Sequence, residues 1–331
     1  MSKNKSMEQT VVKIDIIAGF LGAGKTTLIN KLLNEAYKGE RVALLENEFG
    51  EIGIDGDLLQ GSGIAVKELS NGCICCTLQT DFIKGIQELV ETWKPERILI
   101  EPTGIAQISD VLSPCGKAAA SLPLEINSVI TVVNAESYPA LISVAGEFFT
   151  NQISHAWFIA LSAVQDIHDD EMTLAEMTAS IRSLNPTTPI YTEPWDTIDG
   201  LTLLTAAEEA AAEQGDHDHP HEHNHEHHHN HDHHHEDDTG GFTSASFRFK
   251  SPWTAERVRG LADILKSGDC GEVFRAKGLL PAEENAGTAA FKFDYVYGTT
   301  TVSGIDYPGE GKLVVIGRAL KTDRLERYLS L

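Results

Sequence analysis

The stretch Gly19–Thr27 (GFLGAGKTT) carries the residue types that hold phosphate groups. It fits the phosphate-loop pattern G-x-x-x-x-G-K-[ST] at every fixed position. Backbone N–H groups in such a loop point at the phosphates of a nucleotide, and glycines leave room for that approach. Lys25 would hold the phosphates, and the hydroxyl of Thr26 would bind Mg²⁺. The residues predicted to contact the nucleotide here are Gly19, Gly22, Ala23, Gly24, Lys25, Thr26 and Thr27.

Acidic residues further along the chain could complete this chemistry. Glu101 ends a short apolar run, where phosphate-loop proteins place the acid that holds the Mg²⁺ shell. Gly104 follows three residues later and could approach the γ-phosphate with its backbone N–H. Asp55, in an acidic segment punctuated by glycines, could orient Mg²⁺ or the attacking water, although an ordinary surface carboxylate is an equally simple interpretation. We therefore predict Lys25, Asp55 and Glu101 as the catalytic residues.

Three of the five cysteines, Cys73, Cys75 and Cys76, lie within four residues of one another. Soft thiolates in such a cluster suit Zn²⁺ or Cu(I). Because the cluster supplies at most three ligands, the fourth must come from Glu46, Glu51, a histidine, water or an incoming partner. An incomplete site of this kind suits metal transfer better than permanent structure. Buried, inert thiols are the alternative interpretation.

Residues 214–241 form a low-complexity segment in which histidine alternates with Asp, Glu and Asn. Such a segment cannot bury enough apolar surface to fold, so we predict a disordered linker. Imidazoles near pH 7 are largely neutral and free to bind metals, which favours a weak metal buffer over a merely solvated linker. The twelve histidines of the tract are His217, His219, His221, His223, His225, His227, His228, His229, His231, His233, His234 and His235.

The segment Ser162–Asp166 (SAVQD) follows an apolar run at the point where guanine-binding proteins carry N-K-x-D. Neither the Asn nor the Lys of that pattern is present. Gln165 or Asp166 would have to bind the base instead, so these residues leave the choice between GTP and ATP open.

An apolar run precedes each of the segments with candidate functional residues. Helical patterns lie between successive segments. Because ligands bind at the carboxyl ends of the strands in a parallel doubly wound sheet, the loops that follow these strands should be neighbours. Four strands are predicted first, at Val11–Ala18, Arg41–Asn47, Ile64–Leu69 and Arg97–Ile100. Later strands are predicted at Asn127–Val133, Ala156–Leu161 and Pro189–Thr192, with helices at Leu28–Ala36, Leu78–Trp93, Tyr138–Gln152 and Glu171–Leu184.

The chain is therefore predicted to have an α/β phosphate-loop domain over residues 1–205. The acidic, histidine-rich linker is predicted at 206–241, followed by a smaller α+β domain at 242–331. For that domain we expect strands at Ala245–Lys250, Phe291–Tyr297 and Lys312–Arg318, a helix from Ser251-Pro252 to Lys266, and a final helix at Thr322–Leu331.

A formal net charge of −23 argues against nucleic acid or an anionic membrane as a partner, because phosphate groups would be repelled. The first ten residues are polar, and Lys13 and Asp15 interrupt the first apolar run, so no signal-peptide core is expected. The sequence contains no run of about eighteen apolar residues, so we expect no membrane span. We therefore expect a cytoplasmic protein whose cysteines serve metal or redox chemistry.

Four motifs, GFLGAGKTTL, ENEFGE, NGCICC and EPTG, resemble in order and spacing the CobW-like family of metallochaperone GTPases. The segments Val273–Gly278 and Val315–Arg318 look like the C-terminal domain of that family. The resemblance implies GTP binding with slow hydrolysis, Zn²⁺ (Co²⁺ or Ni²⁺ in some members) at the C-x-C-C motif, delivery to a client apo-metalloprotein, and a nucleotide-dependent homodimer as one assembly. It assigns nucleotide contacts to Gly22, Gly24, Lys25, Thr26 and Thr27, metal contacts to Cys73, Cys75 and Cys76, and nearby metal-binding carboxylates to Glu46 and Glu51.

The leading hypothesis is a zinc chaperone in which the γ-phosphate reshapes the acidic loop and thereby the cysteine loop. A cobalt or nickel insertase on the same scaffold is one alternative. A passive metal-storage protein with little nucleotide turnover is another. A small-molecule kinase would leave the cysteines and histidines without a role.

Overall fold

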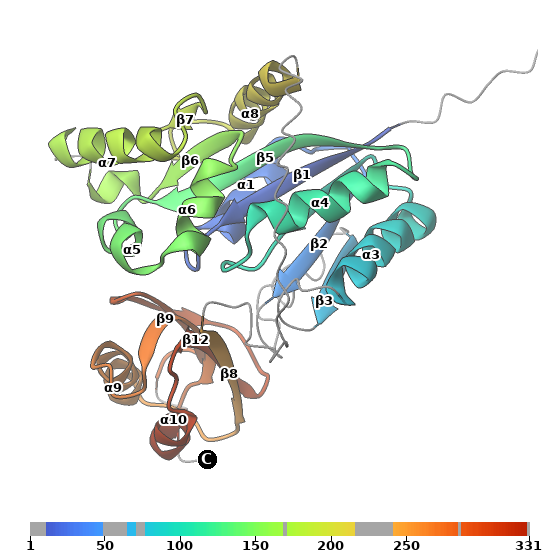
Figure 1. Cartoon of the computed structure of the whole chain (residues 1–331). Helices are drawn as coiled ribbons and strands as arrows, with labels where there is room; N and C mark the ends of the chain where they lie inside the picture. The colour runs from blue at the N-terminus through green and yellow to red at the C-terminus, as the bar shows by residue number, and fades with distance from the viewer. Residues whose placement is uncertain are drawn as a thin grey trace, which may run out of the picture.

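The computed structural model describes residues 11–48, 65–70, 77–167, 171–215, 241–283 and 286–329, which form two domains (Figure 1). The first is a parallel sheet of seven strands in the order β3-β2-β4-β1-β5-β6-β7, with helices on both faces. The predicted doubly wound α/β class is confirmed. The strands are β1 (Val12–Gly19), β2 (Val42–Glu48), β3 (Ala65–Ser70), β4 (Arg97–Glu101), β5 (Leu124–Asn134), β6 (Phe158–Ser162) and β7 (Ile190–Tyr191).

Helices cover both faces of this sheet because its central strands are apolar on both sides. On one face α3 and α4 pack against residues such as Ile16 and Ile100. On the other face α1 and α8 pack against residues such as Ile17 and Leu99. The helices are α1 (Lys25–Glu35), α3 (Thr77–Trp93), α4 (Ile108–Ala119), α5 (Tyr138–Val144), α6 (Glu147–Ser154), α7 (Glu171–Leu184) and α8 (Gly200–Gly215).

Two expectations for this domain need correction. The single helix predicted at Tyr138–Gln152 is two helices, because Gly146 takes a left-handed φ of 66° between α5 and α6. The predicted domain end at residue 205 falls inside α8, which runs to Gly215 and buries Ala207 and Ala210. The first domain therefore includes the whole of α8. Residues 216–240, with the histidine tract, lie outside the described residues.

A buried ionic network ties α8 to the sheet. Asp15 of β1 is fully buried and accepts hydrogen bonds from Arg97 Nη1 (2.5 Å), Ser128 Oγ (2.6 Å) and Tyr37 Oη (3.1 Å). Arg97 also donates from Nη2 to Oε1 of Glu208 on α8, at 3.3 Å. Burial, together with the charge of Asp15, raises the pKa of Tyr37 well above its usual value. Asp15, the acid that interrupts the first apolar run, therefore has a structural role as the ion-pair partner of Arg97 on β4.

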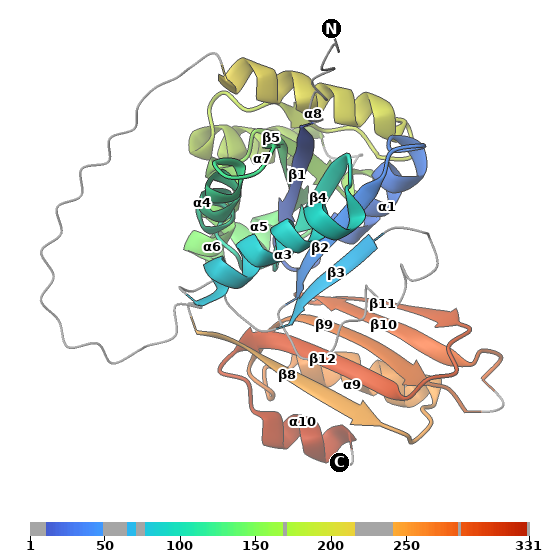
Figure 2. The same ribbon diagram turned by 90° about the vertical axis from the view of Figure 1, so that its right-hand side faces the viewer.

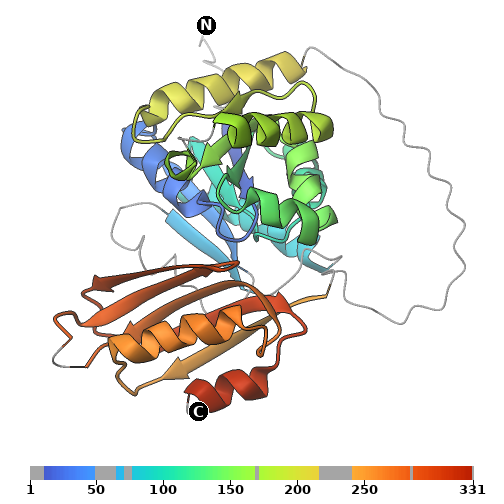
Figure 3. The ribbon, with the colours of Figure 1, turned by 90° about the vertical axis from the view of Figure 1, so that its left-hand side faces the viewer.

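The second domain is an antiparallel sheet in the order β11-β10-β9-β12-β8, which confirms the predicted smaller α+β domain. Alternate residues of β10, such as Phe293 and Tyr295, pack with α9 and α10 on one face. Figures 2 and 3 show both helices on the side of this sheet away from the first domain. The elements are β8 (Phe242–Phe249), α9 (Ala255–Lys266), β9 (Glu272–Pro281), β10 (Ala290–Val296), β11 (Thr299–Ile305), β12 (Gly311–Arg318) and α10 (Thr322–Leu329).

Sequence reasoning missed α4, α8, β9 and β11 and placed one helix start too early. The helix expected from Ser251-Pro252 begins at Ala255 as α9. Thr254 is its N-cap, since its Oγ1 accepts a hydrogen bond from the backbone N–H of Arg257 at 3.0 Å. The β9 strand shows no simple alternation of apolar and polar residues, because the apolar residues Val273 and Phe274 are adjacent, as are Leu279 and Leu280.

An aromatic cluster joins the two domains. Phe20 of the phosphate loop makes edge-to-face contacts with Phe242 and Phe274 of the C-terminal sheet, each with ring centroids 6.1 Å apart. Arg318 stacks on Phe242, with its guanidinium carbon 4.4 Å from the ring centroid, and donates to the carbonyl of Val144 at 2.9 Å. These contacts bring the other face of the C-terminal sheet against the phosphate loop. None of the described helices is long and apolar enough to cross a membrane.

Candidate nucleotide and metal site

The phosphate loop connects the end of β1 to the start of α1, as its pattern predicts. Gly22 and Gly24 have φ angles of +76° and +103°, in the left-handed region that favours glycine. Gly24 is the N-cap of α1, so the free N–H groups of the first helical turn open into the loop. This geometry is a ready-made site for phosphate groups.

Lys25 lies inside the loop and is 8% exposed. Its Nζ donates to the carbonyls of Gly19 (3.0 Å) and Phe20 (3.4 Å). The carboxylate of Glu101 lies 3.9 Å from the same nitrogen. The lysine charge is therefore held at the centre of the loop, where phosphate oxygens would bind.

Thr26 and Glu101 come together from α1 and β4. The Thr26 hydroxyl donates to Glu101 Oε1 at 3.4 Å, and Glu101 is 8% exposed. A hydroxyl and a carboxylate are hard oxygen donors of the kind Mg²⁺ prefers, and they lie beside the phosphate loop. The residues present therefore fit a magnesium ion with its nucleotide, as predicted from their positions along the chain.

The segment that follows β4 passes directly beside the phosphate loop. Gln152 Nε2 fixes this segment by donating to the carbonyls of Gly104 (3.0 Å) and Ala106 (2.9 Å). A Cβ on Gly104 would lie 2.7 Å from the backbone nitrogen of Leu21, so only glycine permits this approach. A contact between the Gly104 N–H and a γ-phosphate remains a prediction.

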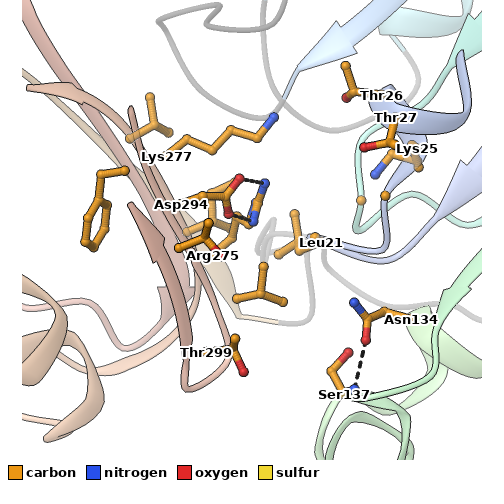
Figure 4. A pocket seen from close by; sticks show the side chains of 18 of the residues that line it. Leu21, Lys25, Thr26, Thr27, Asn134, Ser137, Arg275, Lys277, Asp294 and Thr299 are labelled. Atoms are coloured by element: carbon orange, nitrogen blue, oxygen red, sulfur yellow. Dashed lines mark hydrogen bonds and ion pairs between the residues drawn. The ribbon is translucent and has the colours of Figure 1, made fainter. Parts of the chain in front are cut away.

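The phosphate loop opens into a cavity of about 520 Å³ that lies between the two domains (Figure 4). That volume falls within the usual range for a site that holds a small molecule. Figure 1 shows the carboxyl ends of β2 and β3 pointing toward the C-terminal sheet that forms the opposite wall. From the first domain the charged lining residues are Lys25, Glu46, Glu101 and Glu136, and from the second they are Arg275, Lys277, Lys292 and Asp294.

The C-terminal wall was not predicted from the sequence. Arg275 and Lys277 lie on β9, and Lys292 and Asp294 lie on β10, so all four are far from the phosphate loop along the chain. Arg275 forms a two-contact ion pair with Asp294, of which the Nη2–Oδ2 hydrogen bond is 2.9 Å. No local pattern marks these residues as part of the site.

Residues near the expected base site lie at the ends of β6 and β7. Gln165 and Asp166 belong to a short 3-10 helix (η1, Val164–Asp166) directly after β6, and their role in base recognition remains a prediction. Ser162 Oγ donates to the carbonyl of Ala23 at 2.5 Å and so ties this segment to the phosphate loop. Trp195, which sequence reasoning missed, would contact a Cβ on Gly24 at 3.6 Å.

Most of the predicted metal ligands lie outside the described residues. These are Cys73, Cys75, Cys76, Glu51 and the twelve histidines, and the same holds for the predicted catalytic Asp55. Glu46 of β2 is described, is 2% exposed and lines the cavity. Within the described ranges, no group of three or more His, Cys, Asp or Glu side chains could hold a metal ion.

The two described cysteines are built into the cores. Cys115 on α4 is fully buried, and burial raises its pKa to about 12. Burial also raises the pKa of Cys270, which lies in the core of the second domain. Neither thiol is suited to act as a thiolate ligand at neutral pH.

Two family models match the chain. One, described as the CobW/HypB/UreG nucleotide-binding domain, matches residues 13–192. The other, described as the cobalamin synthesis protein cobW C-terminal domain, matches residues 242–330. The first match covers the first domain as far as β7 and stops before α8, and the second match covers the C-terminal domain.

The chain is also similar to curated proteins. The chain is 33% identical over 211 residues to the zinc chaperone CobW of Sinorhizobium sp, covering 62% of this chain and 56% of that protein. It is 28% identical over 204 residues to zinc-regulated GTPase metalloprotein activator 1 of Schizosaccharomyces pombe, covering 58% and 48%. The chain thus spans about half the length of these curated relatives. The crystal structure of Zn(II)-bound YjiA GTPase from E. coli aligns over 97% of this chain and 98% of that chain, with 19% identity and a TM-score of 0.45.

Proposed function

Because the chain belongs to the CobW/HypB/UreG family, we propose that it is a GTP-dependent zinc metallochaperone. It binds GTP with Mg²⁺ at the phosphate loop, carries Zn²⁺ on Cys73, Cys75 and Cys76, and hydrolyses GTP as the zinc passes to a client apo-metalloprotein. The names of two relatives, a zinc chaperone and a zinc-regulated GTPase, support this assignment. A supply of reduced thiols suits the cytoplasm, where we place the protein.

The phosphate-loop geometry supports the nucleotide step. Lys25 holds the β- and γ-phosphates, and Thr26 and Glu101 hold Mg²⁺ and its water shell. Asp55 orients the attacking water or the metal shell in this proposal. When bound, Mg²⁺ neutralises charge on the phosphates during hydrolysis. Guanine is the proposed base on the strength of the family, since Gln165 and Asp166 would have to replace the usual recognition motif.

The parallel arrangement of β1, β4, β2 and β3 is the observation that carries the proposal. Strands that run parallel in one sheet end at a common edge, so β3, which precedes the cysteine segment, ends at the same edge as β1, which precedes the phosphate loop. Three strand spacings of about 4.8 Å put the two ends roughly 15 Å apart. Glu46 lies between them, in register with Glu101 on one side and Glu68 on the other.

Nucleotide state would change zinc affinity through this shared edge. Coupling between two sites typically amounts to ~1–3 kcal/mol, or about 5–150-fold in affinity. Structural Zn²⁺ binds small peptides by roughly 10–16 kcal/mol. The nucleotide alone therefore cannot expel a tightly held ion, and a client that offers competing ligands takes part in the release.

A chelator-competition titration of Zn²⁺ tests this proposal. It is carried out with Mg²⁺ plus GTP, GDP, ATP or no nucleotide, on the wild type and on Cys73→Ser, Cys75→Ser and Cys76→Ser. We expect zinc affinity to differ about 5-fold or more between GTP and GDP, with each variant binding more weakly. Cys270→Ser, in the core of the second domain, is the matched control and should leave zinc affinity unchanged.

Two outcomes would reject parts of the proposal. Equal zinc affinity in all nucleotide states would reject coupling and favour passive storage. Loss of high-affinity binding on deletion of residues 216–238 would place the principal zinc site in the histidine tract. Repeating the titration with Co²⁺ and Ni²⁺ separates the zinc chaperone from an insertase for those metals.

A further inference from the structure

The carboxamide of Gln152, on α6, holds the segment that follows β4 against the phosphate loop. The Gln152 residue is only 1% exposed. Its Nε2 donates to two carbonyls of that segment, those of Gly104 (3.0 Å) and Ala106 (2.9 Å). Only the N–H end of an amide can bond two carbonyl oxygens, so these partners determine which way the amide is turned. The amide therefore clamps three consecutive residues at two points.

The same helix also holds the far end of this segment. Asn151 Oδ1 accepts a hydrogen bond from the backbone N–H of Ile108, the first residue of α4, at 2.9 Å. Within the segment, the N–H of Ala106 donates to the carbonyl of Thr103 at 3.0 Å and closes a turn. Two consecutive side chains of α6 thus fix both ends of residues 104–108.

The phosphate loop fixes the other side of Gly104. A Cβ on this glycine would lie 2.7 Å from the backbone nitrogen of Leu21 and 2.9 Å from its Cα. Gly104 also lines the cavity into which the phosphate loop opens. Because its carbonyl is held by Gln152 and its Cα lies against the loop, the backbone of Gly104 has little freedom to rotate. Gln152 therefore determines how this backbone is presented to a ligand in the cavity.

Contacts on two sides fix α6 itself. The hydroxyl of Thr131 on β5 donates to the backbone carbonyl of Gln152 at 2.7 Å, which ties the helix to the central sheet. The ring of Phe149 packs edge-to-face on Phe20 of the phosphate loop, with ring centroids 5.7 Å apart. A side chain carried on a rigid element holds its partner more precisely than a side chain on a loop does.

The other end of the Gln152 amide is held at a cost. Among the described residues, its Oε1 is buried and has no hydrogen-bond partner. Burying an unpaired acceptor lowers stability, so this cost is offset only by the bonds that Nε2 makes to Gly104 and Ala106. Natural proteins accept such local costs mostly at functional sites.

We propose that Gln152 is a positioning residue for the nucleotide: by holding residues 104–106, it orients the backbone N–H of Gly104 toward the γ-phosphate of a bound triphosphate. A donor that is already in place costs no reorganisation when the charged oxygen arrives. GDP has no γ-phosphate, so its binding does not use this contact. The assignment rests on the proposed nucleotide-binding function and deepens it, because it names a side chain through which the site distinguishes a triphosphate from a diphosphate.

The test compares affinities for a non-hydrolysable GTP analogue and for GDP, both with Mg²⁺, in the full-length protein. Gln152→Met keeps the length of the side chain and removes the donor. We expect it to weaken binding of the analogue about tenfold, because the Gly104 N–H loses its alignment with a charged oxygen, and to change GDP binding less than about twofold. Gln152→Leu, a second variant without the donor, should show the same difference between the two nucleotides.

Asn185→Leu is the matched control. Asn185 is a second buried carboxamide whose Nδ2 donates to backbone carbonyls, those of Ile153 at 2.9 Å and Ala156 at 3.0 Å, at the carboxyl end of α6. Its replacement also removes buried hydrogen bonds from this helix. We expect it to lower the melting temperature, as Gln152→Met does, and to leave the ratio of the two nucleotide affinities as in the wild type.

Three outcomes separate the ideas. If Gln152→Met weakens binding of the analogue and of GDP equally, or of neither, the positioning role is overturned. It is also overturned if Asn185→Leu lowers the ratio of affinities as much as Gln152→Met does, because a loosened α6 would then account for the effect. If the wild type binds neither nucleotide, the proposed function itself is overturned.

Discussion

Gly22 of the phosphate loop packs against Val296 of the C-terminal sheet, although 274 positions separate them in the chain. The contact leaves no space for a side chain on Gly22. It joins the loop that would hold the nucleotide to the wall that carries Lys277. A change in the spacing of the two domains would therefore directly alter the packing against the phosphate loop.

Gly22→Ala should weaken nucleotide binding and lower the melting temperature. Alanine at a φ of +76° costs roughly 1–2 kcal/mol, and its Cβ would overlap Val296. Adding Val296→Ala should recover part of the loss by removing the γ-carbons. Gly39→Ala is the control, because its φ is +89° but no atom lies within 4 Å of the added Cβ. Equal effects of the two glycine variants would show that the contact with Val296 is unimportant.

Glu101→Gln should remove most of the dependence of nucleotide affinity on Mg²⁺. The variant keeps the size of the side chain beside Thr26 and removes the charge that would hold the metal shell. In the variant, we expect the gain in GTP affinity on adding Mg²⁺ to be at least about tenfold smaller than in the wild type. Fluorescent-nucleotide titration with and without the ion measures this gain. Glu96→Gln, at the surface where it accepts from the backbone N–H of Arg41 at 2.9 Å, should behave as the wild type. An unchanged Mg²⁺ effect in Glu101→Gln would remove Glu101 from the metal site.

Glu208→Gln should make stability less sensitive to acid. Burial by itself would raise the pKa of Glu208, but the hydrogen bond from Asn127 and the charges of Lys13 and Arg97 outweigh it, so the pKa lies below its usual 4.5. Below pH 4.5 the unfolded chain then takes up a proton that the folded chain does not, and stability falls. Urea unfolding between pH 3 and pH 7 measures the slope. Glu209→Gln, on the exposed neighbouring residue, should keep the wild-type slope, and an identical slope for Glu208→Gln would contradict the ionic network.

Alkylation with iodoacetamide should divide the five cysteines into two classes. Cys115 should stay unmodified in the native protein, because it is fully buried with a pKa of about 12, and Cys270 should also be spared. Under the zinc proposal, Cys73, Cys75 and Cys76 react in the metal-free protein and are protected by Zn²⁺, as peptide mass spectrometry would record. Reaction of the three at the same rate with and without Zn²⁺ would argue against them as ligands.

Much of the first domain follows from local sequence patterns. The strands that became β1, β2, β4 and β6 are largely apolar runs, interrupted in β1 by Lys13 and Asp15, which is close to the pattern of a strand buried on both faces. The glycines and Lys25 of the phosphate loop are recognisable because their roles depend on neighbours within nine residues. Helix α8 was missed because its alanine-rich pattern of residues 200–215 blends into the polar segment that follows.

The sequence alone determined the phosphate-loop motif, the order along the chain of the loops that follow the parallel strands, and the presence of a thiol cluster. Each of these features is encoded by residues close together in the chain. Only the tertiary structure decided that Arg275, Lys277 and Asp294 form the second wall of the cavity beside the phosphate loop. Their positions depend on the register of β9 with β10 and on the packing of Phe20 against Phe242 and Phe274. The contacts of Phe20 join residues more than 200 positions apart, so no local pattern can predict which strands of the C-terminal sheet face the phosphate loop.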